Sequence, residues 1–288
     1  MLGVLKEDMS MGCLKALVIA SFTSLAAIAP AAAADLLLPP PPPIEPGYVP
    51  VEFSSGFYLR GDIGEGNPQI RNMTSTYLND PGPGIADLGG TTSAQVLGDV
   101  GVGYQFNNYF RADITGEYRS DSKLVAQSSY TNIYCAIGTC YDGYTASLKT
   151  GLFLLNGYVD LGTWYNVTPY VGVGVGTAVN SLSNYTDTSF STSGYGAAPG
   201  TATRAAFAYA AMAGFSYSLT RNFKLDFGYR YVDMGRISSN AIVCSSLPDC
   251  HYETQHFHLA SNDIRLGLRY IFADPAPPPP AFPIVEKY

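Results

Sequence analysis

Apolar and polar residues alternate with a period of two through the middle of the chain. In the segment 109–119, Phe110 and Ile114 occupy one set of alternate positions. Arg111 and Glu117 occupy the other set. Successive side chains of a β-strand point to opposite faces of the sheet, so the pattern predicts a strand with one apolar face and one charged face.

Eight segments carry this pattern and predict an all-β chain: 57–63, 96–106, 109–119, 144–162, 169–179, 206–217, 223–231 and 263–272. The segment 144–162 is the least regular, because its first half turns Lys149 toward the apolar side. Short connections at 107–108, 163–168 and 220–222 alternate with much longer ones. This alternation predicts an eight-stranded antiparallel transmembrane β-barrel with short periplasmic turns, four long extracellular loops and both termini in the periplasm.

The charged faces hold as many positive as negative residues. They would line a common interior with Arg60, Asp62, Asp99, Arg111, Asp113, Glu117, Arg119, Asp160, Lys224, Asp226, Arg230, Asp263, Arg265 and Arg269. Buried charges are tolerated when they are paired, so a balanced set favours a closed lumen. A soluble β-sandwich is the alternative. Aromatic residues near the short turns, such as Phe106 and Trp164, favour the barrel, because membrane barrels carry aromatic girdles at the interface.

The composition narrows the class of protein further. Only 14% of the residues are charged and the net charge is −7, with no basic cluster. A nucleic-acid partner is therefore not expected. No apolar run of about 20 residues follows the N-terminal region, which argues against a helical membrane protein.

The ends of the chain differ from its middle. Residues 1–34 predict a signal peptide, with a basic start, a short apolar stretch and an Ala-x-Ala cleavage site, and translation starting at Met1, Met9 or Met11. Residues 35–52 and 273–288 are rich in proline and predict a periplasmic linker and tail on either side of a barrel at 53–272. Both are interpreted as spacers, with contact to peptidoglycan as the alternative.

Four cysteines remain after the signal peptide, as two close pairs: Cys135 with Cys140, and Cys244 with Cys250. An even number in an exported chain predicts disulfides, and three connectivities are possible. Local pairing within each predicted loop is favoured over zinc, since neither pair has the spacing of a metal knuckle. All three histidines, His251, His256 and His258, lie near the last loop. They are weak candidates for binding a metal or haem, and no cofactor is predicted.

Three motifs carry a family resemblance: 266–272, with an aromatic residue at its end, 156–162 and 168–176. Together they resemble the small outer-membrane surface-antigen barrels of α-proteobacteria, the "outer-membrane immunogenic protein" group, which is related in architecture to the OmpA membrane domain. The resemblance covers about residues 52–272. It implies the outer membrane of a Gram-negative bacterium, with contacts to membrane lipid, lipopolysaccharide and the barrel-assembly machinery. The proline-rich tail and the four loop cysteines depart from the group.

The leading hypothesis for function is a non-enzymatic outer-membrane protein that supports the envelope and presents its loops as an antigen or adhesin. A small-solute pore is the alternative, because the segments 169–179 and 206–217 place glycine and alanine on the inward face. Capture of haem or a metal by the last loop is a further alternative. An enzyme is not expected, since His258 and Ser261 lie three residues apart and face opposite sides of a strand.

Overall fold

Most of the chain between the two proline-rich ends forms β-strands. The computed structural model describes residues 55–76, 86–130, 139–190, 195–244 and 253–273. The strands are β1 (Gly56–Ser75), β2 (Ala86–Thr92), β3 (Gln95–Gln105), β4 (Phe110–Tyr130), β5 (Cys140–Asp160), β6 (Val167–Ser189), β7 (Tyr195–Ala198), β8 (Ala202–Ser218), β9 (Phe223–Ser238), β10 (Val243–Cys244) and β11 (Gln255–Ala273). Among these residues, no helix reaches the length and apolarity needed to cross a membrane.

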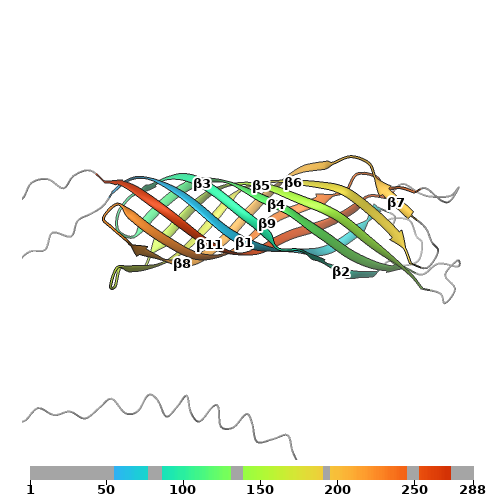
Figure 1. Ribbon diagram of the computed structural model, residues 1–288, viewed down its shortest axis with the longest axis horizontal. Coiled ribbons are helices and arrows are strands. Elements are labelled where there is room, and N and C mark those ends of the chain that lie inside the picture. Colours follow the sequence, from blue (N-terminus) through green and yellow to red (C-terminus); the bar gives the residue numbers. More distant parts are fainter. Residues whose placement is uncertain (1–54, 77–85, 131–138, 191–194, 245–252, 274–288) are drawn as a thin grey trace, which may run out of the picture. The chain divides into compact units, whose positions relative to one another are not determined.

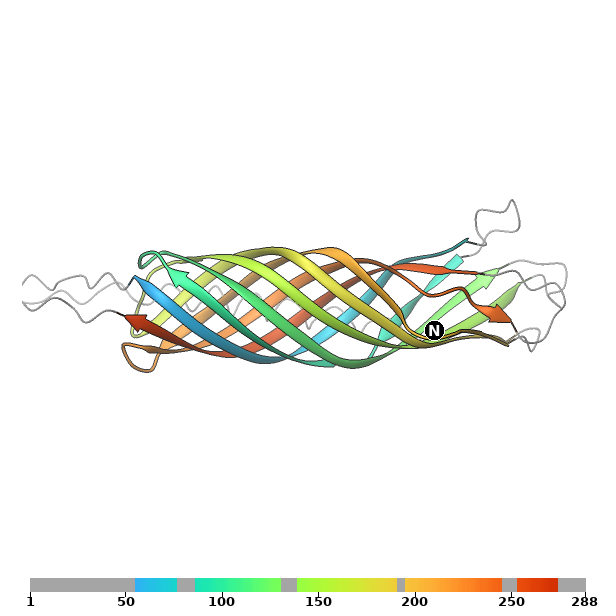
Figure 2. The same ribbon diagram turned by 90° about the horizontal axis from the view of Figure 1, so that it is seen from above.

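Eight of the strands close into a ring. Antiparallel pairing runs through β1, β3, β4, β5, β6, β8, β9 and β11, and β11 pairs back onto β1. The closing ladder runs from Gly56 opposite Ala273 to Ser75 opposite Gln255. Figures 1 and 2 show the strands wound obliquely around the barrel, with β1 and β11 side by side. The predicted eight-stranded antiparallel barrel is confirmed.

Tight hairpins close one end of the barrel, here called the short-turn end. The Phe106 backbone N–H donates to the Phe110 carbonyl at 2.9 Å, and Leu219 does the same to Phe223 at 3.0 Å. Between β5 and β6, Tyr165 and Asn166 both have positive φ (49° and 66°), as a two-residue hairpin turn requires. The opposite end, here called the long-loop end, carries β2, β7 and β10.

The strands are longer at the long-loop end than the sequence predicts. The sequence predicts a long loop between the segments 169–179 and 206–217, but β6 continues to Ser189 and β7 follows it. The expected loop between 119 and 144 is likewise mostly strand, because β4 runs to Tyr130 and β5 begins at Cys140. The prediction assumed that the outward side chains of every strand are apolar. This holds only where the outer face meets lipid, so the predicted strands end too early.

The outer wall is apolar along the half nearer the short turns. Exposed side chains of this wall include Phe57, Leu59, Ile63, Val100, Ile114, Phe153, Leu155, Val173, Val175, Phe207, Ile264 and Leu268. Aromatic rings pair across strands near the short turns, for example Phe57 with Tyr104 at 4.9 Å and Phe223 with Tyr270 at 4.8 Å between centroids. This arrangement matches the aromatic girdle of a membrane barrel.

The predicted signal peptide, linker and tail lie outside the described residues. So do Cys135, Cys250 and His251. Cys140 is disulfide-bonded, and its partner is not among the described side chains. The local cysteine pairing therefore stays a prediction.

Candidate functional site

The predicted lumen charges lie inside the barrel. Thirteen of the fourteen are buried: Arg60, Asp62, Asp99, Arg111, Asp113, Glu117, Arg119, Asp160, Asp226, Arg230, Asp263, Arg265 and Arg269. Lys224, at the short-turn end of β9, is half-buried, and the described residues give it no ion pair. The strand alternation brings these side chains together from all around the ring, in two connected groups and two further ion pairs.

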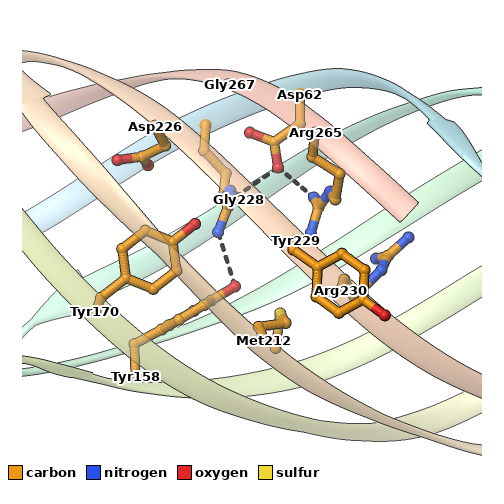
Figure 3. Close-up of a pocket in the computed structure, with 11 residues that line it drawn as sticks. Asp62, Tyr158, Tyr170, Met212, Asp226, Gly228, Tyr229, Arg230, Arg265 and Gly267 are labelled. Carbon is orange, nitrogen blue, oxygen red and sulfur yellow. Dashed lines mark hydrogen bonds and ion pairs between the residues drawn. The ribbon is translucent and has the colours of Figure 1, made fainter. Parts of the chain in front are cut away.

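The first group lies at mid-wall and is centred on Arg60. Its guanidinium donates to Asp113 at 2.9 Å. It also donates to the Tyr158 hydroxyl at 2.8 Å and pairs with Asp62, and these two contacts are dashed in Figure 3. Arg265 reaches across from β11 to pair with both Asp62 and Asp99. Each carboxylate in this group therefore faces at least one arginine, which offsets the cost of burying it.

Two further arginines fill the space toward the short turns. Arg111 pairs with Asp160 at 3.1 Å, and its guanidinium lies 4.1 Å from the ring centroid of Tyr158. Arg269 pairs with Asp226 at 3.1 Å and donates to the Ser216 hydroxyl at 3.0 Å. Arginine suits these positions because its planar group binds a carboxylate and stacks on an aromatic ring at once.

The second group is a buried square of four charges. Arg119 pairs with Glu117 at 2.8 Å and with Asp263 at 2.5 Å. Arg230 pairs with the same two acids, at 2.6 Å and 2.8 Å. The Ser261 hydroxyl also donates to Asp263 at 2.6 Å. The square joins β4, β9 and β11 across the lumen and is electrically neutral.

The small inward residues make room for large ones opposite. A Cβ on Gly172 would lie 2.5 Å from the Tyr158 ring, and a Cβ on Gly228 would lie 2.5 Å from the Tyr170 hydroxyl. The cavity left among Arg60, Tyr158 and Tyr170 measures about 10 Å³ (Figure 3). That is about the space of one water molecule, so the lumen is packed at the level of these three side chains.

Between the square and the long-loop end the interior of the barrel is apolar. A buried cluster fills the long-loop half of the barrel, with Leu124, Tyr144, Leu148, Leu152, Leu182, Tyr185, Met234, Ile237, Phe257 and Leu259 among its members. In this half the strands have apolar side chains inside and polar side chains outside, the reverse of the wall, because their outer face meets water. The sequence prediction missed this plug, although even-numbered apolar residues in 144–154 were a visible signal. They also explain why Lys149 faces outward beside Asp121, at 3.2 Å.

Three carboxylates lie in the upper part of the barrel, beyond the apolar wall. The pKa of Asp187 is raised to about 8, mainly by burial and also by the neighbouring charges of Asp142 and Glu253. Burial also raises the pKa of Asp142 and of Glu253. Among the described residues, no group of three His, Cys, Asp or Glu side chains has the geometry of a metal site.

The histidines of β11 stand on the outer face. His258 Nε2 lies 2.6 Å from Asp233, which also accepts a hydrogen bond from the Tyr209 hydroxyl at 3.2 Å. His256 and His258 are two residues apart and share this face, while Ser261 points inward to Asp263. The sequence analysis did not single out Asp233.

A closed ring with an apolar wall and a filled, ion-paired interior is the construction of the small transmembrane β-barrels. A family model described as "Outer membrane protein beta-barrel domain" matches residues 19–272. The chain belongs to this family, and the predicted resemblance to outer-membrane barrels is confirmed. Family membership also supports an outer-membrane location.

Relatives in several bacteria are similar over most of the chain. An uncharacterized protein of Brucella abortus is 32% identical over 241 residues, which is 78% of this chain and 82% of that protein. Outer membrane protein PagN of Salmonella typhimurium is 27% identical and covers 75% of this chain and 90% of its own length. A Rickettsia felis protein named "Putative adhesin" is 27% identical, and the match covers 76% of this chain and 89% of that protein.

Proposed function

We propose that the protein is a non-enzymatic outer-membrane barrel that works through its outer surface, as an adhesin-like contact protein, with the long-loop end facing out of the cell. The observation that carries this proposal is the filled interior. Ion pairs and tyrosine rings occupy the lower lumen and an apolar cluster occupies the upper lumen, so the wall and the loop end are left as the working surfaces.

The loop end offers a contact surface of its own. Phe190 is 66% exposed and Val243 is 47% exposed, and both lie beyond the apolar wall. Tyr141 and Tyr195 are exposed on the same outer face, because β5, β6 and β7 pair through Gly143, Thr188 and Tyr195. Aromatic side chains exposed to water are typical anchors of protein interfaces. The adhesin name of the Rickettsia felis relative agrees with this proposal.

The positions of His258 and Ser261 do not support a catalytic role for this pair. The Ser261 hydroxyl is engaged by Asp263 inside the barrel, whereas His258 lies outside the wall with Asp233. A serine without a base in reach is a poor nucleophile.

Surface expression of the full chain in a non-adherent Gram-negative host tests the proposal. Adherence to cultured animal cells should rise several-fold over the empty host, and the double variant Phe190→Ser with Val243→Ser should lose most of that gain. Leu88→Ser removes an exposed apolar side chain from β2 and is the matched control. Equal adherence of the expressing and empty hosts, with surface exposure verified by antibody, would refute the adhesion proposal.

The pore hypothesis is tested separately. The purified protein, shown to be folded by its heat-dependent shift on a gel, should give no steady current steps in a planar bilayer. Reproducible ion-selective steps would show that the packed lumen opens.

A further inference from the structure

A row of basic side chains crosses three neighbouring strands on the outside of the barrel. Arg71 on β1 lies opposite His258 on β11, and His258 lies opposite Arg236 on β9. The two arginines are exposed and His258 is partly so. This row of Arg71, His258 and Arg236 is here called the basic row.

A backbone irregularity in β9 aims one member of this row outward. On β9 the inward residues are even-numbered as far as Met234, so Arg236 would also point into the lumen. Gly235, at φ 75°, adds one residue to β9 opposite β11, turns Arg236 out and returns Ile237 to the interior. On β1, Arg71 already points out by strand alternation, and the extra residue at Asn72 (φ 52°) returns Met73 to the interior. Bulges of this kind re-aim side chains at functional places.

Neither arginine of the basic row has a carboxylate partner in the part of the chain that the structure describes. Asp233 holds His258 at 2.6 Å, and Arg71 donates to the neutral Gln69 at 2.9 Å. Among the described residues, Arg236 has no ion pair. Like charges that face one another across a sheet repel, so two arginines in one row cost free energy unless an anion lies between them.

The height of the row matches the headgroup layer of a membrane. Phe272 lies at the short-turn end of the wall, and His258 lies fourteen residues away from it on the same strand. Fourteen residues span about 46 Å along a strand. A tilt of roughly 40° leaves about 35 Å along the barrel axis. The hydrocarbon band of an outer-membrane barrel is about 25 Å tall, so the row stands about 10 Å above it.

A groove runs down the wall below the row, on the same strands. It measures about 540 Å³ and is lined by the apolar side chains Ile63, Val96, Phe227, Ile264 and Leu266. Glu65, Asn67 and Asn262 border it. An acyl chain fits the apolar part of the groove. The Glu65 carboxylate would repel a phosphate from the groove, so a phosphate would bind at the basic row instead.

We propose that the basic row and the groove below it form a binding site for a phosphorylated glycolipid of the outer leaflet, of the lipid A type, with its phosphate on Arg71 and Arg236 and an acyl chain in the groove. His258, held by Asp233, keeps the two guanidinium groups apart so that both can reach one phosphate. The inference rests on the proposed outward orientation of the long-loop end and does not depend on adhesion.

Native mass spectrometry of the full chain, extracted from outer membranes, delipidated and titrated, tests the site. The probes are bisphosphorylated lipid A, the same lipid without phosphates, and inorganic phosphate. Wild-type protein should bind the bisphosphorylated form at least about tenfold more tightly than the dephosphorylated form. Arg71→Gln and Arg236→Gln should each weaken binding about fivefold, and the double variant about 30-fold. Lys123→Gln, which removes an exposed cation from β4, is the control and should bind as wild type does.

Three results would overturn the proposal. The double variant, with a normal heat-dependent gel shift, could bind lipid A as tightly as wild type does. The Lys123 variant could lose as much affinity as the double variant, which would indicate diffuse charge. Inorganic phosphate could compete at equal concentration, which would indicate a site for free anions. The double variant should keep normal adherence, so a failure of the adhesion proposal is visible independently of lipid binding.

Discussion

Replacing Arg230 with methionine tests whether the buried square of charges acts as one unit. Arg230 is almost fully buried and pairs with Glu117 at 2.6 Å and Asp263 at 2.8 Å. Its loss leaves two carboxylates facing Arg119 alone, which is one uncompensated negative charge inside the barrel. Breaking a buried pair in this way costs about 3–5 kcal/mol of unfolding free energy.

Neutralising a second member should recover much of that cost. Glu117→Gln alone strands a positive charge and should also cost about 3–5 kcal/mol. The double variant keeps the Arg119–Asp263 pair at 2.5 Å and is again neutral, so it should lose only about 2 kcal/mol. The two substitutions should therefore be coupled by at least about 3 kcal/mol.

Urea unfolding of the barrel in lipid vesicles measures these values, with fluorescence of the single tryptophan, Trp164, as the signal. Lys149→Gln is the matched control, because the Lys149–Asp121 pair is half exposed and should contribute less than about 1 kcal/mol. Additive effects of the two substitutions, or a cost below about 1 kcal/mol for Arg230→Met, would show that the four charges do not act as one unit.

Other substitutions test the wall, the lumen and the loop end. Leu266→Arg places a charge on the lipid face and should cost about 2–4 kcal/mol near the membrane midplane, measured by the same unfolding assay; normal stability would contradict the inside–outside assignment. Gly172→Val should clash with the Tyr158 ring and cost about 1–3 kcal/mol, whereas Gly157→Ala meets open space and should be close to neutral; equal effects would argue against a packed lumen. The folded chain holds the Asp187 proton more tightly than the unfolded chain does, so the loop end should lose stability as pH rises from about 4 toward about 8. Asp187→Asn should weaken that dependence, measured as hydrogen-exchange protection of the β6–β7 amides at pH 5 and pH 8 after correction for intrinsic rates; an unchanged pH profile would exclude Asp187 as a source of it.

The sequence predicts the wall and the lower lumen because lipid and lumen demand opposite chemistry on alternate residues. Arg111 and Ile114 can be assigned to their faces on that basis alone. The same rule fails beyond the wall, where Leu148 points in and Lys149 points out, because water replaces lipid on the outer face. A second rule, with polar residues outside and apolar residues inside, would have extended β4, β5 and β6 to their full length.

The basic row could not be predicted from alternation. Arg236 has the parity of an inward residue, and only the extra residue at Gly235 turns it out. The packing of the lumen could not be predicted from the sequence either. Glycines opposite Tyr158 and Tyr170 are compatible with an open water path and with a lumen that the tyrosine rings fill. The ring positions decide between them.

The seam between β1 and β11 has a consequence for how the protein is made. It joins the first strand of the wall to the last, so the hydrogen bonds that complete the ring join residues as far apart in sequence as Gly56 and Ala273. Pairing over such a separation forms late, because a long loop must close first. A chain interrupted before β11 would leave unpaired edges on both β1 and β9, which a membrane does not tolerate. Insertion of this barrel therefore acts as a test of complete synthesis, in which a truncated product cannot pass as a smaller barrel.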